Sequence, residues 1–296
     1  MSADAGRFAR IRASCILLRN DLTQDSVVVR LRSRGDVMTT RAPSLFVSHG
    51  SPMMPFEPGP AREALRALGT QYRPRAILCV SAHWETAQPV LGGATQPGTI
   101  HDFYNFPPQL YEQRYAAPGD PALAAQARGL LREAGFEAMV DGARGLDHGA
   151  WVPLMLMYPQ AAIPVVQLSV QPSLDAAHHL RLGRALRGLR DEGVMMLASG
   201  GATHNLRDLR MPPDDDPPAA YAAGFDDWLA TAVEAGDADA LTAYLTQAPE
   251  ARHNHPTPEH YLPLPVALGA AHAPRGRVLH RSFVFGTLSM SSFVWD

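Results

Sequence analysis

The sequence predicts an α/β fold: a single domain with a central, mainly parallel or mixed sheet flanked by helices. Two observations lead to this class. From Ser44 onward, short apolar runs alternate with longer segments of helical pattern, which is typical of units that build a largely parallel sheet. The chain has 296 residues, 46% of them hydrophobic, so it can bury a substantial core in one large domain or two small ones. The stretch rich in proline and aspartate at residues 211–218 is expected to be a surface loop within one domain.

Five compact apolar runs are predicted to be buried strands. Strands that are covered on both faces consist of nearly continuous apolar residues, and these runs have that composition. The predicted strands span residues 44–48, 76–81, 136–140, 164–170 and 194–199.

Helices are predicted between these strands. Asp120 and Pro121 form an N-cap and first-turn pair, and the helical pattern runs to Glu133, with Gly135 in the place of a C-terminal cap. Further helices are expected over residues 173–191 (closed by Gly193), over 219–235, from just after His148 to Tyr158, and from about Glu259 onward.

The composition excludes several classes of protein. A formal net charge of −3 argues against general nucleic-acid binding. Cys15 and Cys79 cannot form a disulfide framework and match no zinc-ribbon spacing, so a reducing, cytoplasmic setting is expected. The longest apolar stretches, such as 152–157 and 194–198, are far shorter than the roughly 20 residues of a membrane helix. We therefore expect neither nucleic acid nor membrane as a partner.

Residues 1–42 are predicted to be a poorly ordered N-terminal extension, and residues 43–296 the folded domain. The first 41 residues contain eight Arg and four acidic residues but only short apolar runs. The run at 15–18 is shorter than the roughly 7 to 15 apolar residues of a signal peptide. Met38 is a candidate for the natural start of the chain.

Three histidines are predicted to lie at the ends of strands. His49 follows the run at 44–48, His83 follows the run at 76–81, and His204 follows the run at 194–199 through a loop of small residues. In open α/β sheets, ligands bind beyond the carboxyl ends of the strands, so these imidazoles could share one metal ion. One such histidine is more often a hydrogen-bonded structural residue, but three in the same setting favour a common site.

Further histidines divide into candidates and residues without a predicted role. His148 precedes a strongly apolar helix, and it either caps this helix or points into the site from the helix N-terminus. His255 and His260 lie in a segment whose prolines fix the backbone, and His260 is expected in the first turn of the helix that begins near Glu259. His253 is expected at the surface. The residues interpreted as structural or solvated are His178, His179, His272 and His280.

Five short motifs carry a resemblance to a known family. They are Ser48-His49-Gly50-Ser51-Pro52, Ser81-Ala82-His83-Trp84, Leu146-Asp147-His148-Gly149-Ala150-Trp151, Thr203-His204-Asn205-Leu206 and His255-Pro256-Thr257-Pro258-Glu259-His260-Tyr261. In content and order they resemble the DODA-type (4,5-DOPA) extradiol ring-opening dioxygenases, within the superfamily of protocatechuate 4,5-dioxygenase catalytic subunits. The resemblance covers roughly Ser44 to the C-terminus. It implies an oxidoreductase that inserts O₂ into a catechol, with a non-haem metal at the C-terminal ends of the strands and residues 43–296 as the catalytic domain.

The resemblance also implies a set of metal ligands. His49 and His83 are two of them, and His260 is preferred as the third, because the DODA-type branch is similar to a three-histidine site. Glu259 is the alternative third ligand, as in the carboxylate-containing site of the wider superfamily, and His255 also competes for this place. Fe(II) is expected for activity, and Zn(II) is an alternative occupant because imidazole suits both metals. Three neutral ligands leave the charge of the ion uncompensated, which should acidify a bound catechol.

Catalytic roles follow from the same resemblance. His204 resembles the family's base, and an unperturbed histidine has a pKa near 6.5, which suits proton transfer at neutral pH. His148 resembles a second histidine that contacts the substrate or the oxygen intermediate. His255 is expected to orient the substrate. The polar and aromatic loop at residues 101–106 is expected either to line the pocket or to be a packed turn.

The expected partners are O₂ and a small catechol, either DOPA-like or another dihydroxylated aromatic, in the catabolism of aromatic compounds. A Memo-like metal-binding protein with a signalling or redox role is the alternative within the same superfamily. A cysteine near the last ligand would favour that alternative, but Cys79 falls inside a predicted strand. The sequence leaves open which catechol is bound and whether the chain is a monomer or a homodimer.

Overall fold

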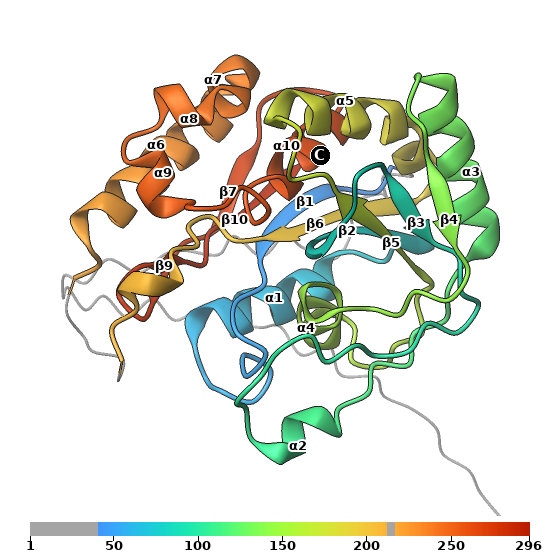
Figure 1. The fold of residues 1–296 in the computed structure, drawn as a ribbon, viewed down its shortest axis with the longest axis horizontal. Coiled ribbons are helices and arrows are strands. Elements are labelled where there is room, and N and C mark those ends of the chain that lie inside the picture. The colour runs from blue at the N-terminus through green and yellow to red at the C-terminus, as the bar shows by residue number, and fades with distance from the viewer. Residues whose placement is uncertain (1–40, 212–216) are drawn as a thin grey trace, which may run out of the picture. The chain divides into compact units, whose positions relative to one another are not determined.

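The computed structural model describes residues 41–211 and 217–296 (Figure 1). Within these residues, eight strands form one sheet in the order β4-β3-β5-β2-β6-β1-β10-β7. These strands are β1 (Ser44–Ser48), β2 (Ala76–Glu85), β3 (Val90–Gly92), β4 (Met139–Asp141), β5 (Val165–Val170), β6 (Val194–Gly200), β7 (Arg277–His280) and β10 (Ser292–Trp295). A separate two-stranded ribbon consists of β8 (Phe283–Val284) and β9 (Leu288–Ser289).

The sheet is parallel at its centre and antiparallel in parts of its margins. β1 and β2 both pair in parallel with β6, and β2 also pairs in parallel with β5. β10 runs antiparallel to β1 and to β7, and β3 runs antiparallel to β5. The mixed α/β sheet that the sequence predicts is therefore confirmed, and the carboxyl ends of β1, β6 and β2 lie side by side.

Helices cover both faces of this sheet, which explains why its central strands β1, β5 and β6 are buried along their whole length and mostly apolar. α3 (Pro121–Glu133), α5 (Ala176–Leu186) and α10 (Pro263–Ala270) lie over one face, whereas α1 (Pro60–Gln71) and α4 (His148–Met157) lie over the other (Figure 1). Within β1, Phe46 packs in the core on the side of α5 and α10, while Leu45 and Val47 pack on the side of α1 and α4. The other helical elements are α2 (Pro108–Tyr111), η1 (Arg187–Glu192), η2 (Leu206–Asp208), α6 (Ala220–Ala235), α7 (Ala238–Thr242), α8 (Tyr244–Gln247) and α9 (Ala251–Asn254).

The strand predictions hold best where both faces of a strand are buried. β1 has the predicted bounds, and β5 and β6 differ from them by one residue. β2 continues beyond its predicted end to Glu85, which pairs with Val170 of β5 after a shift of register that follows Val80. The sequence pattern stops short of this extension because His83 and Glu85 interrupt the apolar run.

Side-chain caps start the helices where the sequence places them. Asp120 accepts a hydrogen bond from the N–H of Leu123 at the start of α3, and Gly135 after this helix has a φ of +88°. Asp147, not His148, caps α4, so His148 is the first residue inside that helix. Of the two roles left open for His148, the cap is therefore excluded.

The predicted start of the last helix, near Glu259, is wrong. Residues 259–262 form a turn, and α10 begins at Pro263. The physical reason is the pair Pro263 and Pro265, which lack an N–H and are tolerated only in the first turn of a helix. His260 consequently lies in the turn that precedes α10.

Two predicted segments fall partly outside the described residues. Of the extension predicted over residues 1–42, residues 1–40 are not described, while Ala42 is buried and its N–H donates to the carbonyl oxygen of Arg190 (2.9 Å). Of the loop predicted at 211–218, residues 212–216 are not described. Among the helices of the described segments, none combines the length and the apolar character needed to cross a membrane.

Candidate metal centre

His49 and His83 meet where the parallel strands end. His49 directly follows β1, and its N–H donates to the carbonyl oxygen of Gly200, the last residue of β6 (3.1 Å). His83 lies in β2 just beyond Ser81, where the pairing of β2 with β6 ends. The two Nε2 atoms are 3.1 Å apart. The order of the neighbouring strands β2, β6 and β1 thus brings these two imidazoles together.

His260 joins them from the turn before α10. Its carbonyl oxygen accepts a hydrogen bond from the N–H of Gly201 (3.0 Å), and its Nε2 lies 3.2 Å from the Nε2 of His83. Gly200 permits this approach, because a Cβ at residue 200 would lie well under 3.0 Å from the carbonyl oxygen of His260. The structure therefore gathers the three histidines of the predicted ligand set at one point, with their ligand atoms within 4.8 Å of one another.

Carboxylates orient two of these rings. Oε1 of Glu259 lies 3.0 Å from Nδ1 of His260, and Oδ2 of Asp102 lies 3.4 Å from Nδ1 of His83. An ionised carboxylate only accepts hydrogen bonds, so the bond to Glu259 places the proton of His260 on Nδ1. The negative charge of Asp102 beside Nδ1 of His83 favours the same proton position in that ring. The Nε2 atom of each ring then carries a lone pair.

Ser199 gives His49 the same tautomer. The Oγ of Ser199 lies 3.0 Å from Nδ1 of His49, and its hydroxyl donates to the carbonyl oxygen of Gly149. Because the only hydroxyl proton is used there, Ser199 accepts from the Nδ1–H of His49. All three Nε2 lone pairs thus face one another, and the outer hydrogen bonds are of the kind that orient metal-bound imidazoles. This donor set fits a divalent iron or zinc ion.

Burial keeps the three imidazoles neutral. It lowers the pKa of His49 and of His260 well below the usual value, and the neighbouring histidines lower both further. The pKa of His83 falls to about 3, chiefly through burial and then through His148, while Asp102 acts in the opposite direction. A histidine must be neutral to bind a metal ion, so these rings are in the required form at pH 7.

His204 lies directly against His260. The N–H of His204 donates to the carbonyl oxygen of Asn254 (2.9 Å), and its ring stacks on that of His260 with centroids 3.3 Å apart and planes at 10°. Burial, followed by the charges of His255 and His148, lowers the pKa of His204 to about 3. The residue predicted as the base is thus a neutral ring beside the candidate ligands.

His148 faces the same cluster from the start of α4. Its ring centroid lies 3.8 Å from that of His83 and 5.4 Å from that of His49. Asp102 holds it at two points, since Oδ1 accepts the backbone N–H (2.9 Å) and Oδ2 accepts the Nδ1–H (3.0 Å). Burial raises the pKa of Asp102, but the hydrogen bonds and charge of His148 outweigh burial and lower this pKa to about 2.

His255 is set apart from the Nε2 cluster. It is 3% exposed, and its Nε2 donates to the carbonyl oxygen of Ala202 (3.0 Å). Its ring packs against Phe225 and Tyr261, with centroids 5.3 and 5.4 Å away. Burial lowers the pKa of His255 to about 4, and its Nδ1 has no hydrogen-bond partner among the described residues.

A family match accompanies this geometry. Residues 43–295 match the model of the catalytic LigB subunit of aromatic ring-opening dioxygenase. The chain belongs to this family.

Individual relatives agree with this membership. The chain is 46% identical over 256 residues to a 4,5-DOPA dioxygenase extradiol of Beta vulgaris, covering 84% of this chain and 95% of that protein. It is 44% identical over 237 residues to a protein of the same name from Escherichia coli (strain K12), covering 78% and 86%. A crystal structure of an uncharacterized protein from Escherichia coli K12 has a TM-score of 0.72 at 35% identity and covers 86% of this chain and 100% of that one. The LigB-family chain is thus an enzyme, an extradiol ring-opening dioxygenase.

Two residues of the LigB-family site were not singled out from the sequence. Ser199 ends a predicted strand, and Asp102 lies in the loop at 101–106, which was expected only as a pocket wall or a packed turn. Of that loop, Phe103 packs its ring 5.8 Å from His148, whereas Tyr104 is 84% exposed. The loop therefore contacts the site through Asp102 and Phe103.

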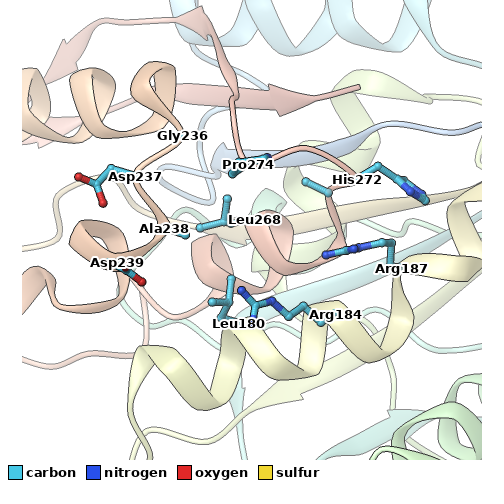
Figure 2. A pocket seen from close by; sticks show the side chains of 11 residues that line it. Leu180, Arg184, Arg187, Gly236, Asp237, Ala238, Asp239, Leu268, His272 and Pro274 are labelled. Atoms are coloured by element: carbon cyan, nitrogen blue, oxygen red, sulfur yellow. The ribbon is translucent and has the colours of Figure 1, made fainter.

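A separate pocket of about 380 Å³ lies between α5, α7 and α10 (Figure 2). Charged side chains of both signs line it, namely Arg184, Arg187, Asp237 and Asp239, together with His272. The six histidines assigned to the LigB-family site do not line it. That site is defined by the side chains at the strand ends and not by this pocket.

Proposed function

We propose that the chain cleaves a catechol ring beside its two hydroxyl groups, with O₂ as co-substrate and Fe(II) as the metal. The observation that carries this proposal is the convergence of three neutral imidazoles, with His49 and His260 buried and His83 partly buried, whose Nε2 atoms lie 3.1 and 3.2 Å apart. The relatives named 4,5-DOPA dioxygenase extradiol support a DOPA-like or other dihydroxylated aromatic substrate. Catabolism of such aromatics in the cytoplasm is part of the proposal, supported by the low cysteine content and by Cys79, a buried free thiol.

His49, His83 and His260 are the proposed metal ligands. A bound Fe(II) would supply open positions for the catechol oxygens and O₂ and would pass electron density from the ring to oxygen. Zn(II) is an alternative occupant for the same imidazoles. Glu259 does not bind the metal in this proposal. Its Oε1 accepts a hydrogen bond from Nδ1 of His260 and so orients the ring of this ligand. His255 is left out of the ligand set, because its Nε2 bonds to a backbone carbonyl.

His204 is the proposed base. A base must begin in the neutral form, and burial keeps this ring neutral at pH 7. Stacking on His260 holds His204 beside the ligands. In this position its ring can take a proton from a catechol hydroxyl and return it later in the reaction.

His148 and His255 are the proposed substrate-side histidines. Because Nδ1 of His148 donates to Asp102, its Nε2 is the nitrogen left to contact the substrate. His255 is an electrostatic neighbour of His204, and its part in orienting the substrate would be exerted through that ring.

Loading with Fe(II) tests the proposed reaction. The protein is loaded without oxygen and then mixed with a panel of catechols in aerated buffer. We expect a yellow semialdehyde product and the consumption of equal amounts of O₂ and catechol. His49→Ala should lose both metal and activity, whereas His253→Ala, the same change at an exposed residue, should lose neither. Tight metal binding without O₂ uptake for any catechol would favour the Memo-like alternative.

Metal analysis of four variants tests the ligand set. His49→Ala, His83→Ala and His260→Ala are each expected to remove most of the metal. Glu259→Gln should retain it, because the amide oxygen can still accept from Nδ1 of His260. If Glu259→Gln empties the site while His260→Ala does not, the carboxylate is the third ligand.

A further inference from the structure

We propose that Asp102 is a positioning residue, whose carboxylate oxygen Oδ2 fixes the ring tautomers of both His83 and His148. This inference rests on the proposed function, in which His83 binds the metal and His148 contacts the substrate. Asp102 lies outside the five sequence motifs, in the loop at residues 101–106.

The geometry places one carboxylate against two rings. Oδ2 of Asp102 lies 3.0 Å from Nδ1 of His148 and 3.4 Å from Nδ1 of His83. The centroids of these two rings are 3.8 Å apart. Oδ1 accepts the backbone N–H of His148 (2.9 Å), so both carboxylate oxygens are engaged. Asp102 is thus the shared neighbour of a proposed ligand and a proposed substrate contact.

The protons of these contacts have one consistent arrangement. Since the carboxylate only accepts, the hydrogen bond to His148 places a proton on Nδ1 of that ring. The same negative oxygen lies 3.4 Å from Nδ1 of the neutral His83, so its charge favours the His83 proton on Nδ1 and leaves a lone pair on Nε2. Nε2 of His83 is the atom that faces the Nε2 atoms of His49 and His260. In the opposite tautomer an N–H would point into the cluster, and His83 would have no lone pair there for a metal ion. Asp102 therefore selects the tautomer that can bind.

A purely structural role for Asp102 has different consequences. Through the N–H of His148, the side chain also ties the loop at 101–106 to the first turn of α4, where a negative charge is favourable. Loss of that tie alone would lower the stability of the protein. Loss of tautomer control would instead weaken metal binding in a folded protein.

Asp102→Asn separates these roles because it keeps the shape of the side chain. When the asparagine keeps its oxygen on the backbone N–H of His148, its amide nitrogen takes the place of Oδ2. That nitrogen donates and cannot accept, so both rings lose their acceptor. The Zn²⁺-loaded protein is titrated with a chelator, and we expect the variant to bind Zn²⁺ about 10- to 100-fold more weakly, as for other outer partners of metal-binding histidines. Asp120→Asn is the matched control, because Asn caps α3 as well as Asp does and Zn²⁺ affinity should not change.

Histidine-selective ¹⁵N NMR of the Zn²⁺-loaded protein gives a second readout. His148 of the wild type is expected to carry its proton on Nδ1, and Asp102→Asn is expected to change this pattern. If the wild type carries the proton of His148 on Nε2, the inference is overturned, even if the variant does not fold. A variant that is less stable but has wild-type Zn²⁺ affinity and an unchanged spectrum also overturns it, in favour of the structural role.

Both readouts work without a catechol, so failure of this inference and failure of the proposed function can be told apart. If the Fe(II)-loaded wild type cleaves no catechol but Asp102→Asn still releases Zn²⁺ more readily, the proposed function fails and the positioning role stands. If Zn²⁺ release is unchanged while the wild type cleaves catechols, the positioning role fails and the function stands.

Discussion

Replacing Gly200 by Ala should damage the metal site through the backbone alone. Gly200 ends β6 and is buried against the turn that carries His260. A Cβ at this residue would lie well under 3.0 Å from the carbonyl oxygen of His260 and 3.3 Å from Cγ of Pro263. The carbonyl oxygen is a backbone atom and the Cγ belongs to the rigid ring of Pro263, so the Cβ cannot be accommodated without shifting the turn that carries His260.

The expected cost has two parts. Forcing extra atoms into a packed core costs about 1–3 kcal/mol. The shift also strains the hydrogen bond from the N–H of Gly201 to the carbonyl oxygen of His260, a bond worth about 1 kcal/mol. We therefore expect Gly200→Ala to lower the free energy of unfolding by about 2–4 kcal/mol. Because His260 moves, the folded variant should also hold less metal.

Urea unfolding and metal analysis check both effects. The matched control is Gly129→Ala inside α3, where a Cβ would meet no atom within 4 Å. This control should be stabilised by about 1 kcal/mol, since Ala is the better helix former, and should keep its metal. If Gly200→Ala is as stable as the wild type and fully metal-loaded, the close packing of β6 against the His260 turn is not what shapes the site.

Three other changes test separate parts of the account. His204→Ala should keep its metal but lose about 10²- to 10⁴-fold in ring-cleavage rate, the usual cost of losing a positioned base; loss of metal would instead make His204 a ligand. Acid should destabilise the fold through His179, because burial lowers the pKa of this residue to about 4. Between pH 6.5 and pH 4 His179 is protonated only in the unfolded state, so the free energy of unfolding should fall by about 3 kcal/mol as the pH falls through this range. Urea unfolding across this range should show a smaller loss for His179→Gln, and an equal loss would refute the assignment. Deleting residues 1–37 should leave folding and metal content intact, because the family match begins at residue 43, and an insoluble or metal-free product would place the extension in the fold.

The sequence predicted the centre of the fold well because the signal there is local. β1 is an apolar run buried on both faces, and α3 has its own cap and stop, Asp120 and Gly135. The short strands at the margins of the sheet have no such local sequence signal. β3 and β10 gain their stability by pairing with distant strands, so neither was predicted.

The candidate metal ligands could also be predicted from the sequence, whereas the residues that hydrogen-bond to the histidine rings could not. His49 and His83 stand at strand ends, a position that the sequence pattern reveals. Asp102 reaches His148 across 46 residues, and Ser199 reaches His49 across 150. Such contacts depend on how loops and strands pack in three dimensions, and a lone Asp or Ser in a loop or strand end gives no local sign of them.

Labelled oxygen tests the central claim most directly. The Fe(II)-loaded protein is supplied with ¹⁸O₂ and a catechol that it turns over, and the product is analysed by mass spectrometry. Extradiol cleavage by the three-histidine site predicts that both atoms of one O₂ molecule enter a ring-opened product, and that His49→Ala forms none. A product that is merely oxidised, with no label and an intact ring, would contradict the account.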